Sequence, residues 1–233
     1  MTQWNIQLSR NLIKQRHGVA QLALARNALR AVTVRLDHAR YHFLELKRLL
    51  REHIDDELVE QNLYDIALPG GKGWDALQEG LVKVEAHMIA CAQSVHAVPD
   101  ALAHLAFFAA GLNFAQKPLR EENVSIKTLL ANSTLVAAGH GAVQVALREL
   151  ADNPSFAALE AAVNYAKHRG LPDPALQLEP EDHPGPYAMQ FESFPYGGVV
   201  RPRVEVERML APAYVAVSQA VVRTGNAINA CLA

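Results

Sequence analysis

Apolar positions recur at alternating steps of three and four along most of the chain, which is the spacing of amphipathic α-helices. The first such stripe consists of Leu22, Ala25, Leu29, Val32, Leu36, Ala39, Phe43, Leu46 and Leu50. It predicts one long helix over about residues 19–62, with an N-terminal extension that Gly18 would interrupt. Similar patterns predict a short helix near 125–131, a helix over 134–151 and a last helix over 205–231. Another helix begins at Asn153-Pro154, with asparagine as its cap, and ends in AAVNYAKHRG.

A second apolar stripe runs through residues 81–105 and continues across Pro99. This continuity predicts one helix kinked at the proline, because proline removes a backbone donor and crowds the preceding turn. Residues 86–116 contain a single Asp, Glu, Lys or Arg, which is Asp100. A helix that is apolar on every side is covered on every side. Residues 86–110 are therefore expected to form the buried central helix, with Asp100 inside the protein.

Residues 171–204 hold seven of the twelve prolines and cannot form a long helix. Within them YAMQFESF and VVRPRVEV flank PYGG, a pattern that predicts a β-hairpin. The segment IALPGGKGW at 66–74 predicts a turn between helices. The fold expected is all-α: an up-and-down-type bundle of about five or six helices in a single domain over 1–233. The proline-rich insertion at 171–204 precedes the last helix.

Charge is distributed unevenly along a chain whose formal net charge is −2. Residues 1–53 carry ten Lys and Arg against three acids, a balance of +7, so the remaining residues carry −9. Five arginines of this basic helix fall on a face turned away from its apolar stripe: Arg26, Arg30, Arg40, Arg48 and Arg51. Such a face is either simply solvated or a contact for an acidic partner or RNA.

Half of the 233 residues are hydrophobic, which suffices for a core without disulfides. Cys91 and Cys231 lie in apolar helical contexts and are expected to be small buried hydrophobes. The N-terminal residues show no apolar run typical of a secretory signal, and no stretch has the length of a membrane span. A cytoplasmic protein without a membrane partner is expected. From Met209 onward the sole charged side chain is Arg223, so a homo-oligomer through the C-terminal helix is also expected.

Candidate chemistry centres on His96, Asp100 and His104, which follow one another at steps of four and so share one helix face. His38 and His42 have the same spacing on the first long helix. Three interpretations stay open for these residues. His96, Asp100 and His104 suit a metal ion, since helical His pairs chelate at this spacing. All five suit acid-base catalysis or a ligand pocket, or a buried polar network that fixes helix register. The sequence requires no cofactor.

A second group lies at the end of the 154–169 helix: Asn164, Lys167, His168 and Arg169. Cations at a helix C-terminus commonly complement the helix dipole. The same residues are candidates for binding a phosphate or a nucleic-acid backbone.

Arginine followed, after four to six intervening residues, by histidine occurs at Arg10…His17, Arg35…His42 and Arg48…His53. With the long helices and the late VNYAKHRG helix end, this layout resembles the HEPN-like helical bundles. Many of those are ribonucleases or toxins that use an arginine and a histidine at this spacing. The resemblance leaves out 171–204 and implies nucleic-acid processing. We expect a helical protein acting through oligomerisation or partner binding. A HEPN-like nuclease and a metal-dependent or acid-base enzyme are the alternatives, so enzyme activity stays open.

Overall fold

The structure, a computed structural model, describes residues 3–52, 69–70, 73–169, 174–178 and 187–233. It is mostly helical, with two small antiparallel sheets near the C-terminal helix, which confirms the all-α prediction at that level. The helices are α1 (Ile6–Leu50), α4 (Trp74–His96), α5 (Val98–Ala109), α6 (Ile126–Ala131), α7 (Thr134–Ala137), α8 (Gly141–Ala151), α9 (Pro154–His168) and α10 (Val206–Leu232). Two 3₁₀ turns, η2 (Leu112–Phe114) and η3 (Glu121–Asn123), follow α5.

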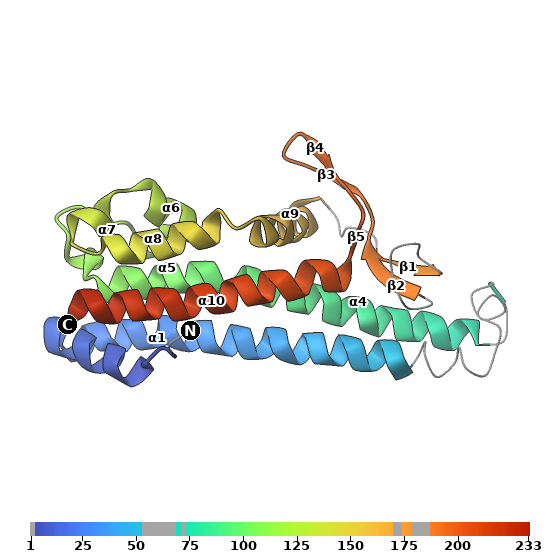
Figure 1. The fold of residues 1–233 in the computed structure, drawn as a ribbon, viewed down its shortest axis with the longest axis horizontal. Helices are drawn as coiled ribbons and strands as arrows, with labels where there is room; N and C mark the ends of the chain where they lie inside the picture. The colour runs from blue at the N-terminus through green and yellow to red at the C-terminus, as the bar shows by residue number, and fades with distance from the viewer. Residues whose placement is uncertain (1–2, 53–68, 71–72, 170–173, 179–186) are drawn as a thin grey trace.

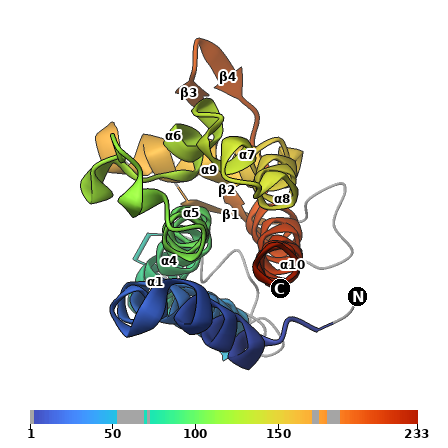
Figure 2. The ribbon, with the colours of Figure 1, turned by 90° about the vertical axis from the view of Figure 1, so that its left-hand side faces the viewer.

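The long helices lie along one axis (Figure 1). The long arm of α1, the α4–α5 pair, α8 and α10 follow that axis in alternating directions, whereas α9 runs across it (Figure 2). Viewed along the axis, α5 lies between α1, α10 and the group formed by α6 and α8 (Figure 2), and it contacts all four. In α5, Asp100 and His104 alone are not buried. The prediction of an apolar central helix is therefore confirmed for α5.

The kink predicted at Pro99 separates two helices rather than bending one. α4 ends at His96 and α5 begins at Val98, with Ala97 between them in right-handed helical backbone geometry (φ −85°, ψ −9°). Proline has no N–H to continue the hydrogen-bond ladder, and the ladder resumes where the amide of Ala101 donates to the carbonyl of Ala97. Asp100 is half-buried rather than enclosed. Its expected place inside the core is therefore wrong.

Gly18 divides α1 into two arms, as the sequence predicted. Its backbone angles (φ 86°, ψ 178°) are strained for residues with a side chain. The short arm before Gly18 turns sharply from the long arm (Figure 1). The helix is described as far as Leu50, and the rest of its predicted length, to residue 62, lies mostly outside the described residues.

The short arm is fixed by a buried polar network with α10. The indole N–H of Trp4 donates to Ser9 Oγ at 2.8 Å, and the Ser9 hydroxyl donates to Asn229 Oδ1. The Asn229 amide donates in turn to the backbone carbonyl of Asn5. The Trp4 ring lies directly over Gly225 of α10. These contacts attach the start of the described chain to its last helix.

A second predicted helix is also divided, whereas the last ones lie where they were expected. The helix expected over 134–151 breaks into α7 and α8, because Gly139 adopts a left-handed conformation (φ 83°) and the buried His140 precedes α8. Gly141, two residues after Gly139, was a further signal of a break in the sequence. α6, α9 and α10 lie where the pattern placed them. The side chain of Asn153 accepts from the amides of Ser155 and Phe156, which is the expected cap of α9.

The predicted hairpin is present with one continuous register. β2 (Tyr187–Phe191) pairs with β5 (Val204–Glu205), and β3 (Phe194–Tyr196) pairs with β4 (Val199–Arg201). Gly197 and Gly198, both with positive φ, form the two-residue turn. β1 (Pro174–Leu178) pairs antiparallel with the other side of β2. The sequence pattern did not predict this strand, because prolines surround it. Of the predicted turn at 66–74, positions 69, 70 and 73 are described as turn and Trp74 already opens α4; the other positions lie outside the described residues.

The low charge of α10 is explained by packing within the chain. This helix contacts α1, α4, α5, α8 and α9, and its buried residues include Leu210, Val217 and Ile228. The expected homo-oligomer therefore stays a prediction. None of the helices in the described part of the chain is long and apolar enough to cross a membrane.

The contact between Trp4 and Gly225 provides a test of the fold. A Cβ at position 225 would overlap the indole, whereas a Cβ at Gly141, the first residue of α8, would meet nothing within 4 Å. We expect Gly225→Ala to lower the free energy of unfolding by about 1–3 kcal/mol through overpacking. Urea denaturation measures the change. Gly141→Ala is the matched control, and equal stability of the two variants would contradict the packing described.

Candidate functional site: a pocket between α1, α5 and α9

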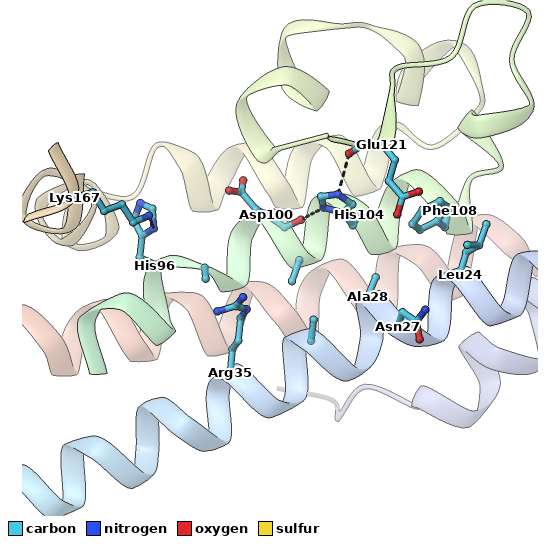
Figure 3. A pocket seen from close by; sticks show the side chains of 13 residues that line it. Leu24, Asn27, Ala28, Arg35, His96, Asp100, His104, Phe108, Glu121 and Lys167 are labelled. Carbon is cyan, nitrogen blue, oxygen red and sulfur yellow. Dashed lines mark hydrogen bonds between the residues drawn. The ribbon is translucent and has the colours of Figure 1, made fainter. Parts of the chain in front are cut away.

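A cavity of about 400 Å³ lies between α1, the α4–α5 junction and α9 (Figure 3). Its volume lies within the range of small-molecule sites, roughly 300–1,000 Å³. The residues that line it are Leu24, Asn27, Ala28, Ala31, Arg35, His96, Ala97, Asp100, Ala101, His104, Phe108, Glu121 and Lys167. The pocket thus combines the predicted His96–Asp100–His104 face with one residue, Lys167, of the second predicted group.

Two side chains of α1 form hydrogen bonds that attach α1 to the end of α5 beside this pocket. The Gln21 amide donates to the carbonyl of Phe108 at 2.6 Å and also bonds Asn113. The ring Nε2 of His17 lies 3.1 Å from the carbonyl of Ala109. The last carbonyls of a helix have no partner within it, so these side chains both satisfy α5 and position the pocket wall that α1 contributes.

Asp100 and His104 each have a structural partner. Oδ1 of Asp100 accepts the amide of Ile126 at 2.9 Å and so caps the N-terminus of α6. Nδ1 of His104 lies 2.9 Å from the carbonyl of Asp100, and Nε2 lies 3.2 Å from the carbonyl of Glu121 (Figure 3). A neutral imidazole has one N–H for these two acceptors. Both residues thus connect α5 to the segment that follows it.

His96 is held differently. Its ring stacks on Phe156 of α9, and its Nδ1 lies 3.5 Å from the ammonium of Lys167. Because an ammonium can only donate, Nδ1 accepts and the ring proton is on Nε2. Burial, and then the charge of Lys167, lower the pKa of His96 below its usual value. His96 is thus a neutral hydrogen-bond donor at neutral pH.

Arg35 and Lys167 bring two cations to the pocket from helices far apart in the sequence. No ion pair joins either of them to a residue that the structure describes. Lys127, by contrast, is paired with Glu160 at 2.8 Å, and this hydrogen bond raises the pKa of Lys127. The two pocket cations therefore keep donors available to a ligand.

Sequence reasoning missed Arg35, Asn27, Phe108 and Glu121 as pocket residues. A signal existed for Arg35, which lies three residues after the buried Val32 and next to Leu36, at the edge of the apolar stripe. Arg26 and Arg40 have the same spacing from residues of that stripe, so this signal did not single out Arg35. Glu121 follows a linker without any periodicity, so its place beside α5 had no signal in the sequence.

The metal interpretation has no geometric support. Among the described residues, no group of three His, Cys, Asp or Glu side chains is arranged to hold a metal ion. In the predicted set, His104 faces two carbonyls, Asp100 caps α6 and His96 faces Lys167. The three side chains lie on one wall of the pocket but do not point toward a common position where an ion could bind.

The His38–His42 group forms a separate cluster between α1 and α4. Nδ1 of His42 lies 3.0 Å from Nδ1 of His87, and Tyr41 contacts both rings. Burial lowers the pKa of His42 below its usual value, with smaller contributions from His87 and His38. The two predicted histidine clusters therefore do not converge.

Cys91 also lies between α1 and α4, where its thiol donates to the carbonyl of Ala39. Burial raises the pKa of this thiol to about 12. The expectation of a buried, unreactive cysteine is confirmed here, whereas Cys231 is half-buried.

The group at the end of α9 is divided. Lys167 lines the pocket, whereas the Asn164 amide donates to the hydroxyl of Tyr196 on β3 at 3.3 Å. His168 and Arg169 are exposed and do not line the pocket. One of the four phosphate-binding candidates is thus placed where a small ligand would bind.

The arginine and histidine pairs behind the HEPN-like resemblance have other partners. His17 faces the carbonyl of Ala109, and His42 faces His87. Arg48 forms ion pairs with Glu45 and Glu52, and His53 lies outside the described residues.

No family model, curated protein or solved structure matches this chain. The HEPN-like resemblance therefore stays a prediction, and the pocket has to be interpreted from its own chemistry.

The His42–His87 contact predicts weaker folding in acid. The unfolded state binds a proton at the ordinary pKa of histidine, whereas the folded state, with the lowered pKa of His42, binds it at lower pH. Stability is therefore complete above about pH 6.5 and falls as the pH decreases below it. We expect the free energy of unfolding, measured with urea, to decrease from pH 7.5 to pH 5.5.

His42→Gln should reduce this decrease without abolishing it, because the pKa values of His96 and His140 are also lowered by burial. Between pH 7.5 and 8.5 His42 is neutral in both states, so the variant and the parent protein should change in parallel there. An undiminished loss of stability in His42→Gln would show that the contact has no such effect.

Proposed function

We propose that the protein binds a small organic molecule through an anionic group, a carboxylate or a phosphate. Arg35, Lys167 and the Nε2–H of His96 hold that group. The observation that supports the proposal is the presence of two cations in a pocket of about 400 Å³ with no ion pair to a described residue. Charge-assisted donors of this kind are the usual means of recognising carboxylate and phosphate.

The chemistry of each donor suits this role. Arginine presents a planar fork that matches a carboxylate or phosphate, and lysine supplies a compact charge. His96, neutral with its proton on Nε2, adds a directional donor rather than a proton acceptor. The absence of a base and of a nucleophile among these three groups favours binding over acid-base chemistry.

Anion binding is testable with butanoate and inorganic phosphate as probes, with the ring signals of His96 followed by NMR. A bound anion stabilises the imidazolium, so saturation should raise the pKa of His96 toward its ordinary value. Arg35→Gln and Lys167→Gln should each weaken the binding about ten-fold, the loss of one hydrogen bond to a charged group.

Arg40→Gln is the matched control, because Arg40 is exposed on the same helix and does not line the pocket. It should leave both the affinity and the titration of His96 unchanged. The proposal fails if neither probe binds, or if binding is equally strong in all three variants and in the parent protein.

The outer face of α1 supports a second candidate, the acidic partner or RNA expected from the sequence. Arg26, Arg30 and Arg40 are exposed, and no ion pair joins them to the described residues. Single-stranded RNA should bind with an affinity that falls steeply with salt. Replacing Arg26 and Arg30 by Gln should weaken binding and flatten the salt dependence in fluorescence anisotropy. Arg223→Gln, at an arginine paired with Glu149, is the control; equal effects of both changes would contradict a specific face.

A further inference from the structure

The pocket has a second end with different chemistry. Glu121 of η3 approaches α5 beside Phe108, and Leu24 and Asn27 of α1 lie across from it (Figure 3). No ion pair joins the carboxylate of Glu121 to a described residue. This end therefore offers a negatively charged hydrogen-bond acceptor next to an apolar surface, whereas the end at Lys167 and His96 offers hydrogen-bond donors.

The charges that line the cavity balance. Arg35 and Lys167 contribute two positive charges, and Asp100 and Glu121 contribute two negative charges. The carboxylate of Asp100 already accepts the amide of Ile126. The carboxylate of Glu121 is exposed and has no ion pair to a described residue, so it can pair with a cationic group of a ligand.

We infer that the ligand is a zwitterion: an aliphatic molecule with an acidic group at one end and a primary amine at the other. The acidic group lies at Arg35, Lys167 and His96, the methylene chain lies along Ala28 of α1, and the ammonium pairs with Glu121. This inference rests on the proposed anion-binding function and names its ligand class.

The test compares two series of probes by isothermal titration calorimetry: 4-aminobutanoate, 6-aminohexanoate and 8-aminooctanoate, and the same carboxylates without the amine. The three chain lengths sample different spans between the two ends. We expect at least one amino compound to bind about five-fold more tightly than its counterpart, the strength of one partly exposed ion pair.

Glu121→Gln should abolish that preference without weakening the binding of the simple carboxylates, because it removes a negative charge from the cavity. The backbone carbonyl that faces His104 is retained in this variant. Glu122→Gln, at the adjacent exposed carboxylate beside Arg120, is the matched control and should keep the preference.

The failures of the two proposals differ. If the simple carboxylates bind in a manner that depends on Arg35 but no amino compound binds more tightly, the zwitterion is wrong and anion binding stands. The zwitterion is also wrong if Glu121→Gln retains the preference. If no carboxylate of either series binds, the zwitterion is wrong, and if inorganic phosphate does not bind either, the proposed function itself is wrong.

Discussion

Pro99 cannot donate a backbone hydrogen bond, and the arrangement of the pocket depends on this constraint. The break that it causes at Ala97 leaves His96 at the end of one helix and Asp100 in the first turn of the next. An acidic residue in a first turn is favourable, and here its side chain also reaches across to cap α6. The proline thereby sets where α4 ends, next to α9. It also sets where α5 begins, and the segment with η3 and α6 follows α5 in the chain.

The pocket is built from two kinds of polar group. Asp100 and His104 are hydrogen-bonded to backbone groups of the chain itself, so these two side chains serve to hold the fold together. Arg35, Lys167 and Glu121 have no such ion partners in the described part of the chain, and their side chains reach the same cavity from three different elements. All three side chains are exposed, so what suggests a ligand is that two cations and a carboxylate line one cavity without an ion pair to a described residue.

Sequence periodicity predicted the features that depend on neighbouring residues. The shared face of His96, Asp100 and His104 follows from a spacing of four, and it survives the break at Ala97 because the backbone there keeps helical angles. What meets that face did not follow from the sequence. Ile126 reaches Asp100 from 26 residues away, and Arg35 and Lys167 reach the cavity only once α1 and α9 have packed on α5. Contacts across elements depend on rotation and register of helices, which a single sequence does not determine.

The junction between the short arm of α1 and α10 has a consequence for how the chain is made. Ser9 and Asn229 are separated by 220 positions, so their hydrogen bond closes almost the whole described chain into a loop. A ribosome produces the N-terminus first, and domains fold as synthesis proceeds. Trp4 therefore cannot pack on Gly225 until α10 has been synthesised. During that interval the short arm lacks the contacts that Asn229 and Gly225 of α10 provide.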